Sequence, residues 1–213
     1  MKNPNYDTFV FDLGRVLVDF DHHISALKIA KLTGRPEDWL YQLFFESELT
    51  KLFDEGKVSS RKFYGEMKKL IGFKISFNEF VPIWSDIFKE KKDMCEFVTT
   101  LKKDYRLVLM SNVNELQFEH IRKNFSIISY FDELVLSYEV GAMKPAPKIY
   151  QVAIKAANTT SPDRIIYIDD RSELIEGGKL AGIKSSFVFT DLEQFKKDLE
   201  SVGIEINEYV EVR

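Results

Sequence analysis

Cysteine is almost absent from this sequence, with Cys95 the single example among 213 residues. One cysteine excludes a disulfide framework within the chain and favours a reducing, cytoplasmic location, with Cys95 itself inert. Long apolar runs are also missing, so no segment is expected to span a membrane, and the polar stretch 1–7 lacks the apolar core of a secretory signal. The net charge is only −4, which gives no indication of a nucleic-acid partner.

Hydrophobic residues make up 45% of the chain and charged residues 30%, the balance of a soluble globular protein. Short continuous apolar runs predict buried strands at 8–11, 106–110, 133–136, 164–168 and 186–189. After residue 93 these runs alternate with helical patterns at 93–103, 115–124, 147–157, 172–181 and 191–201. This alternation is typical of an α/β fold with a parallel sheet covered by helices on both faces.

The segment from about residue 24 to residue 92 has a helical pattern throughout. Gly34 and Gly72 suit helix ends, Pro36 suits a first turn, and Ser76 with Glu79 has the spacing of a capping box. The pattern predicts four helices inserted after the first strand. The expected division is a core domain of 1–20 and 93–213 and a helical domain of 21–92.

Polar side chains stand where several predicted strands end. Asp12 follows the first strand, Ser111 and Asn112 follow the second, and Asp169 with Asp170 closes the fourth. Because ligands of parallel sheets bind beyond the carboxyl ends of the strands, these residues should converge. Three carboxylates brought so close repel one another unless a cation neutralises them, and Mg²⁺ is the hard divalent cation that such oxygens hold.

Lys144 lies in the loop Gly141-Ala142-Met143-Lys144-Pro145, which can fix a point charge beside a phosphate. The hydroxyl of Ser111, the amide of Asn112 and free backbone N–H groups are donors that phosphoryl oxygens need. A cation, a lysine and these donors together describe a phosphate site. Asp12 is then the candidate nucleophile, which would form an aspartyl-phosphate.

Four stretches carry a resemblance to a known family: Phe11-Asp12-Leu13-Gly14, Met110-Ser111-Asn112, Lys144-Pro145 and Ile168-Asp169-Asp170. In this order and separation they are similar to the signatures of the haloacid dehalogenase (HAD) superfamily, over nearly the whole chain. The resemblance implies a Rossmann-like HAD core with an inserted four-helix cap of the C1 type. It also implies a Mg²⁺-dependent phosphatase of a small phosphorylated metabolite, with small sugar-phosphate phosphatases, including glucose-1-phosphate phosphatase-like proteins, as the most similar subgroup.

The resemblance further implies the role of each site residue. Asp12, Ser111 and Lys144 would be catalytic, with Asp12 attacking phosphorus. Ser111, Asn112 and Lys144 would bind the phosphoryl group of the substrate. The metal site would consist of the Asp12 carboxylate, the Gly14 carbonyl and Asp170, with Asp169 acting through water or by orienting Lys144.

Three positions depart from the family pattern. Gly14 replaces the aspartate that serves as general acid and base in most relatives, Arg15 replaces a smaller residue, and Leu174 replaces an Asn or Asp. One hypothesis is that a residue just past the first strand partly supplies the missing acid; the candidates are Asp21, His22 and His23.

Two other functions stay open on sequence alone. A dehalogenase would use Asp12 to attack carbon, without a metal, and a catalytically weak relative would act as a binding or regulatory module. Phe44, Phe45 and Trp84 suit the core of the helical insert better than a substrate wall. The sequence leaves open the oligomeric state, and whether 205–213 forms an edge strand, an oligomer contact or a tail.

Overall fold

The computed structural model describes residues 3–204, and its centre is a five-stranded parallel sheet in the order β5-β4-β1-β6-β7. Phe11 of β1 is in register with Leu109 of β4 on one side and Ile168 of β6 on the other. All five predicted strands and their parallel arrangement are confirmed. Their bounds are β1 Thr8–Phe11, β4 Arg106–Ser111, β5 Glu133–Leu136, β6 Ile165–Asp169 and β7 Ser185–Val188.

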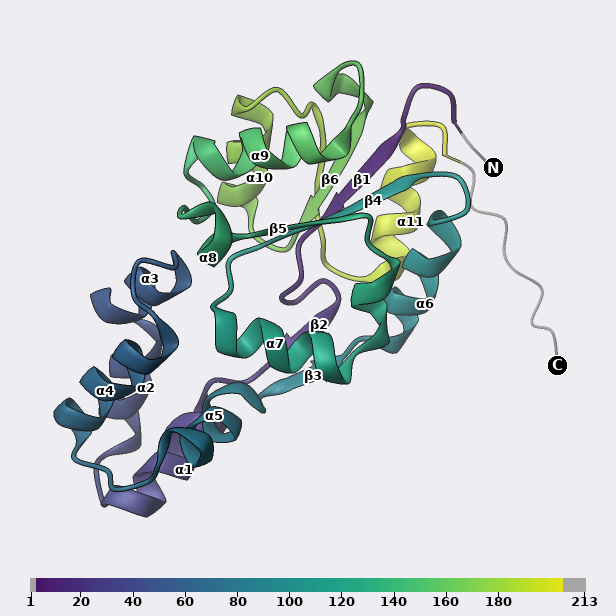
Figure 1. Cartoon of the computed structure of the whole chain (residues 1–213). Coiled ribbons are helices and arrows are strands. Elements are labelled where there is room, and N and C mark those ends of the chain that lie inside the picture. Colours follow the sequence, from purple (N-terminus) through teal and green to yellow (C-terminus); the bar gives the residue numbers. More distant parts are fainter. Residues whose placement is uncertain (1–2, 205–213) are drawn as a thin grey trace, which may run out of the picture.

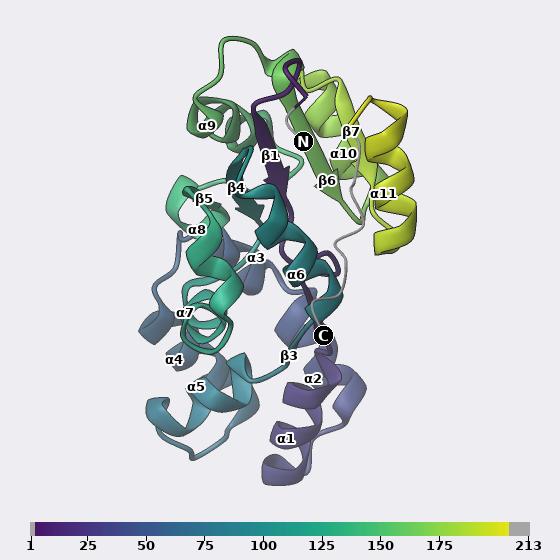
Figure 2. The same ribbon diagram turned by 90° about the vertical axis from the view of Figure 1, so that its right-hand side faces the viewer.

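Helices cover both faces of the sheet (Figures 1 and 2). Alternate strand residues point to opposite faces, so Phe9 and Phe11 pack with one layer of helices and Val10 with the other. The first layer contains α6 Lys92–Leu101, α7 Glu115–Asn124, η1 Ser126–Tyr130 and α11 Leu192–Ser201. The second contains α9 Pro147–Ala157 and α10 Ser172–Leu180. Two short helical turns are α8 Ser137–Val140 and η2 Pro162–Arg164.

The strand order explains where a site can form. The chain runs outward from β1 through β4 to β5, then returns to the other side of β1 with β6 and β7. The carboxyl ends of β1, β4 and β6 therefore lie next to one another, with β1 in the middle. A crevice at such a change of direction is the usual ligand position in open α/β sheets.

A helical insert follows the first strand, as predicted, and is entered and left through a short antiparallel ribbon of β2 Val18–Phe20 and β3 Phe88–Glu90. The ribbon was not predicted, because three-residue strands carry too little pattern to stand out beside helices. The insert contains five helices where four were expected. They are α1 His23–Thr33, α2 Glu37–Phe45, α3 Glu48–Asp54, α4 Ser60–Ile71 and α5 Phe77–Ser85.

The additional helix arises because α2 ends at Phe45 and Ser47 starts α3 by accepting a hydrogen bond from the backbone N–H of Thr50. The other predicted helix ends are confirmed: Gly34 and Gly72 take the left-handed conformation, and Ser76 forms a complete capping box with Glu79. The insert has a hydrophobic core of its own, in which Phe44 is fully buried. Figure 1 shows the insert below and beside the sheet, next to the ends of its strands.

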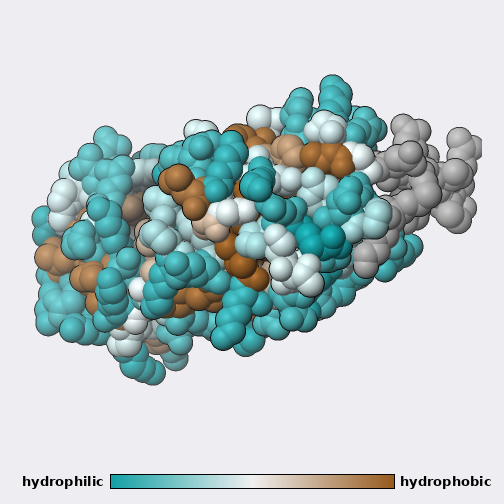
Figure 3. All heavy atoms as spheres, turned by 90° about the horizontal axis from the view of Figure 1, so that it is seen from above, coloured by the Kyte–Doolittle hydropathy of each residue, from teal (hydrophilic) through white to brown (hydrophobic). Residues whose placement is uncertain are grey.

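The surface seen in Figure 3 carries small apolar groups separated by polar side chains. Within residues 3–204, none of the helices combines the length and the apolar character that crossing a membrane requires. Cys95 is buried, and burial raises the pKa of its thiol to about 12. The segment 205–213, for which the sequence left three possibilities, lies outside the described residues.

Candidate active site

Three carboxylates meet at the ends of β1 and β6, as the sequence predicted. Asp12, Asp169 and Asp170 each offer an oxygen, and these oxygens lie within 4.8 Å of one another. Asp12 and Asp169 are buried and Asp170 is half-buried. Each stands at the last residue of a strand or directly after it, so the parallel sheet itself brings the three together.

Lys144 comes from the loop before α9 and is the cation that faces this cluster. Its Nζ donates hydrogen bonds to Asp12 Oδ1 and to Asp169 Oδ2, both at 2.6 Å, and to the carbonyl of Met110 at 3.1 Å. The side chain is almost completely buried. Three buried donors to two carboxylates and a carbonyl satisfy the ammonium fully, which is the condition for burying a charge.

The cluster carries more negative than positive charge. Three carboxylates face one ammonium, which leaves a formal charge of −2. Burial raises the pKa of Asp12 to about 7, although Lys144 works in the opposite direction, and Asp169 raises it further. Burial alone would lower the pKa of Lys144, but Asp12 and Asp169 outweigh it and hold that pKa above its ordinary value. A divalent cation would neutralise the remaining charge, and oxygen donors are what Mg²⁺ prefers.

Several neighbours fix the cluster in place. The side-chain amide of Asn112 donates to the carbonyl of Lys144 at 2.9 Å and accepts from its backbone N–H at 2.7 Å. The hydroxyl of Tyr167 donates to Asp169 Oδ2 at 2.6 Å, and the backbone N–H of Arg171 donates to Asp169 Oδ1 at 3.1 Å. Tyr167 was not predicted as a site residue; its place within the apolar run of β6 concealed it.

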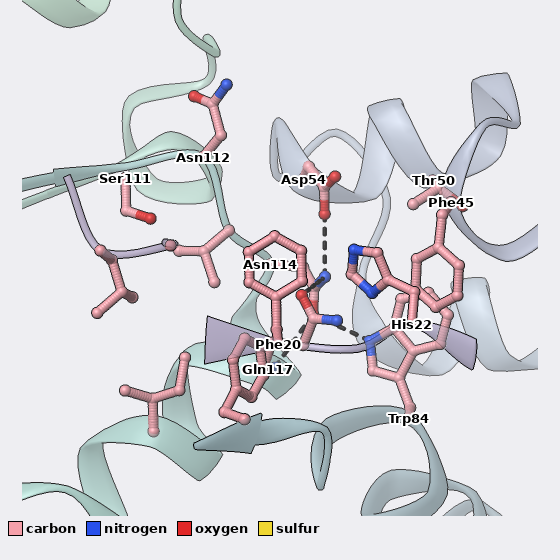
Figure 4. Close-up of a pocket in the computed structure, with 15 residues that line it drawn as sticks. Phe20, His22, Phe45, Thr50, Asp54, Trp84, Ser111, Asn112, Asn114 and Gln117 are labelled. Carbon is pink, nitrogen blue, oxygen red and sulfur yellow. Dashed lines mark hydrogen bonds between the residues drawn. The ribbon is translucent and has the colours of Figure 1, made fainter. Parts of the chain in front are cut away.

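A pocket of about 120 Å³ opens at the same strand ends, and its walls come from both parts of the chain. The sheet core contributes Gly14, Ser111 and Asn112, and the helical insert contributes His22 and Asp54 among others. Figure 4 shows Ser111 and Asn112 on one side of the pocket and His22, Asp54 and Trp84 on the other. The predicted residues Asp12, Ser111, Asn112, Lys144, Asp169 and Asp170 are thus gathered at one edge of the sheet, beside a cavity suited to a small molecule.

A family model described as haloacid dehalogenase-like hydrolase matches residues 9–188. The chain belongs to this family. Among curated proteins, the D-ribitol-5-phosphate phosphatase of Bacteroides thetaiotaomicron is 28% identical over 83% of this chain and 88% of its own length. The glyceraldehyde 3-phosphate phosphatase of Methanothermobacter thermautotrophicus is 31% identical over 49% of this chain and 46% of its own length.

Solved structures of haloacid dehalogenase-like proteins share the fold. A family enzyme of Bacteroides thetaiotaomicron, in complex with magnesium and inorganic phosphate, matches with a TM-score of 0.79 at 20% identity, covering 89% of this chain and 98% of that one. An L-2-haloacid dehalogenase of Xanthobacter autotrophicus matches with a TM-score of 0.62 at 15% identity, covering 94% of this chain and 85% of that one. Both likenesses confirm an α/β core with a helical insert of this kind.

Two departures of this haloacid dehalogenase-like chain are linked through one ring. A Cβ atom on Gly14 would lie 2.9 Å from Cε1 of Phe20, so the ring fills the space where a side chain at position 14 would begin. The guanidinium of Arg15 lies 4.4 Å from the centre of the same ring. Arg15 has a φ of 59°, a left-handed conformation that residues other than glycine rarely adopt. Gly14 and Arg15 therefore both accommodate Phe20. Leu174, the third departure, is buried.

Sequence reasoning missed a hydrogen-bond network that joins the insert to the core (Figure 4). Asn114 at the start of α7 donates to Asp54 Oδ1 and to Gln117 Oε1, both at 2.9 Å, and accepts from Trp84 Nε1 at 3.1 Å. Asp54 and Trp84 stand 60 and 30 residues from Asn114 in the chain, so no local pattern could reveal these two contacts. Phe44, Phe45 and Trp84 belong to the core of the insert or pack against it, as predicted, and Phe45 and Trp84 also line the pocket.

Asp21, His22 and His23, the residues suggested as sources of an acid in place of a side chain at position 14, differ in where they lie. His22 lines the pocket, where its ring stacks on Phe45 with centres 3.7 Å apart. Burial lowers the pKa of His22 to about 4, and its Nδ1 has no hydrogen-bond partner within the described residues. Asp21 and His23 are exposed and do not line the pocket; His23 pairs instead with Glu37.

Proposed function

We propose that this protein is a Mg²⁺-dependent phosphatase that hydrolyses a small sugar or polyol phosphate through an aspartyl-phosphate on Asp12. The observation that carries the proposal is the group of Asp12, Asp169 and Asp170 within 4.8 Å, with the single ammonium of Lys144 against it. A site that is two positive charges short of neutrality fits a divalent cation, and a phosphate ester can bind beside that ion. A dehalogenase has no use for that excess of carboxylates.

The donor set suits magnesium. Asp12, Asp170 and the carbonyl of Gly14 would hold the ion, with Asp169 acting through water or through its hydrogen bond to Lys144. When bound, Mg²⁺ would screen the negative charge of the phosphoryl group and of the carboxylates. The magnesium and phosphate in the similar Bacteroides enzyme support this assignment.

The side chains around the metal site have distinct roles in the transfer of the phosphoryl group. Asp12 Oδ attacks phosphorus in line with the leaving oxygen, and the ester bond breaks as the aspartyl-phosphate forms. The positive charge of Lys144 and the hydroxyl of Ser111 would stabilise the phosphoryl oxygens as negative charge moves onto them. The two hydrogen bonds between the Asn112 amide and the backbone of Lys144 make Asn112 foremost a positioning residue for that lysine.

The class of substrate follows from the pocket and from the relatives. A volume of about 120 Å³ suits a small leaving group, and polar atoms of His22 and Gln117 can bind hydroxyl groups. The relatives named above act on ribitol 5-phosphate and glyceraldehyde 3-phosphate, both small and hydroxylated. In this account residues 21–92 form a cap of the C1 type that moves on the β2–β3 ribbon and excludes water during the reaction.

The experiment is a screen of phosphate esters with and without Mg²⁺, including ribitol 5-phosphate, other sugar phosphates, nucleotides and p-nitrophenyl phosphate. We expect Mg²⁺-dependent release of phosphate, at least about 100-fold faster than in the Asp12→Asn variant. Asp163→Asn, which changes an exposed carboxylate paired with Lys184, is the matched control and should retain full activity. Equal rates for wild type and Asp12→Asn on every ester would refute the proposal.

One observation favours a second candidate, a weakly active relative that binds a phosphorylated ligand without efficient turnover. The position of the usual acid is a glycine, and Phe20 fills the space beside it. Such a protein would bind Mg²⁺ and the phosphate mimic beryllofluoride but hydrolyse none of the esters. The same screen, with beryllofluoride binding measured in parallel, separates the two candidates.

A further inference from the structure

The proton that an ester leaving group needs must come from a residue other than the one at position 14. Gly14 has no side chain, and the ring of Phe20 lies where one would begin. Two side chains pack against this ring: the Arg15 guanidinium lies 4.4 Å and the His22 ring 4.8 Å from its centre. A donor must therefore reach the pocket from another wall.

Among the fifteen residues that line the pocket, only His22 and Asp54 ionise between acid and neutral pH. His22 is a poor donor, because burial lowers its pKa to about 4 and leaves the ring neutral in neutral solution. The pKa of Asp54 is shifted in the opposite direction: burial raises it to about 6, although the hydrogen bond from Asn114 opposes the shift. A carboxyl of this kind can both give and take a proton near neutrality.

The position of Asp54 is fixed from both parts of the chain. Its Oδ1 accepts a hydrogen bond from Asn114 Nδ2 at 2.9 Å, and its backbone carbonyl accepts one from the hydroxyl of Ser137 at 2.6 Å. Both donors belong to the sheet core, whereas Asp54 ends helix α3 of the insert. Asn114 is itself held by Trp84 and Gln117. Figure 4 shows the Asp54 side chain on the wall of the pocket that faces Ser111 and Asn112.

We infer that Asp54 is the general acid and base of this site. It lies on the helical insert and is held in place by hydrogen bonds from Asn114 and Ser137. The inference rests on the proposed phosphatase function. Asp12 bonds to phosphorus while the ester P–O bond breaks, and Asp54 gives its proton to the departing oxygen, which leaves as an alcohol. The Asp54 carboxylate next takes a proton from water, whose oxygen bonds to phosphorus as the bond to Asp12 breaks. Inorganic phosphate leaves, with Asp12 again a carboxylate and Asp54 again an acid.

This role also couples chemistry to closure of the insert over the core. The hydrogen bonds that orient Asp54 come from the core, so they exist only when the end of α3 is docked there. The backbone just after α3 also lies very close to the sheet core. A Cβ on Gly56 would lie only 1.9 Å from the carbonyl oxygen of Tyr138, so only glycine fits there. Docking therefore brings the acid to the reacting oxygen at the moment the pocket closes.

The test compares leaving groups in wild type, Asp54→Asn and the control Glu48→Gln, which alters an exposed carboxylate of the same helix, paired with Lys51. Nitrophenolate leaves readily without a proton, whereas phenolate and the alkoxide of ribitol need one. For Asp54→Asn we compare kcat/KM, which covers only the steps up to departure of the leaving group. We expect kcat/KM on phenyl phosphate and ribitol 5-phosphate to fall about 100-fold or more, and kcat/KM on p-nitrophenyl phosphate to fall less than about 10-fold. Glu48→Gln should match wild type on all three.

An equal loss of kcat/KM on all three esters, or no loss, would overturn the assignment of Asp54. The thermal unfolding of Asp54→Asn is measured alongside, and Asp54→Glu should restore part of the rate on the two poor leaving groups. If wild type and Asp12→Asn are equally inactive on every ester, the phosphatase function itself fails. If wild type turns over but Asp54→Asn keeps the leaving-group dependence of wild type, only the inference about Asp54 fails.

Discussion

The two halves of the site are built in different ways. The core half, Asp12, Lys144 and Asp169, consists of charged groups that pair with one another beyond the ends of the strands. The cap half, His22, Asp54 and Trp84, consists of polar groups among aromatic rings, held by single hydrogen bonds to the core or by none. The comparison teaches that charge balance organises the core half, whereas docking of the insert organises the cap half. Substitutions should accordingly damage the two halves to different degrees.

The largest effect is expected for Lys144→Met, which leaves two buried carboxylates without their cation. Loss of one partner from a buried ion pair costs about 3–5 kcal/mol, so the free energy of unfolding should fall by about that amount without Mg²⁺. Added Mg²⁺ should restore part of it, because the ion takes over some of the charge balance. Urea unfolding with and without Mg²⁺ measures this.

The control for that substitution is Lys148→Met, which changes an exposed lysine on α9 whose Nζ donates a hydrogen bond to the carbonyl of Val140. It should change the free energy of unfolding by less than about 0.5 kcal/mol. If Lys144→Met were as mild as this control, charge balance would not be what organises the core half.

Asn114→Ala should come next, because it removes the side chain that links the halves. The change deletes the N-cap of α7, worth about 1 kcal/mol, and leaves the buried Trp84 N–H without an acceptor, worth about 1–3 kcal/mol. We expect a total loss of about 2–4 kcal/mol in chemical unfolding. Asn124→Ala, at the exposed end of the same helix, serves as control. A loss no greater than in the control would mean that the network contributes little to docking.

The sequence predicted the core half of the site well and the cap half poorly. The strands and the residues at their ends were predicted, because a continuous apolar run that stops at Asp12 or Asp169 is a local pattern. Tyr167 escaped because it lies inside such a run, and the β2–β3 ribbon because its strands have three residues each. Asp54 and Asn114 meet across 60 residues through tertiary contacts alone, so no spacing could predict them.

His22→Phe should change how stability depends on pH. The pKa of His22 is about 4 in the folded protein and about 6.5 when unfolded, so unfolding takes up a proton as the pH falls between these values. Wild type should therefore lose up to about 3 kcal/mol relative to the variant between pH 7 and pH 4. Unfolding curves of both proteins across this range measure the difference. Parallel curves would show that the His22 ring is not held neutral by the pocket.

The smallest effect is expected for the hydrogen bond between Trp84 and Asn114, tested with Trp84→Phe, which removes the indole N–H together with part of the buried ring system. Asn114 Oδ1 retains the hydrogen bond from the backbone N–H of Gln117 at 3.1 Å, so no acceptor is left unpaired. The hydrogen bond should account for about 1 kcal/mol of the loss in urea unfolding, and the cavity that the smaller ring leaves accounts for the rest. In the background of Asn114→Ala the same change should cost about 1 kcal/mol less than in wild type, and an equal loss in both backgrounds would contradict the pairing of the two side chains.

The most direct measurement of the central claim is the binding of beryllofluoride, which mimics the phosphoryl group on an aspartate, followed by fluorine NMR. With Mg²⁺ present, wild type should bind one beryllofluoride per chain, and binding should disappear on chelation of Mg²⁺ and in Asp12→Asn. Binding that persists without Mg²⁺ or without the Asp12 carboxylate would contradict the account, as would its absence from wild type with Mg²⁺.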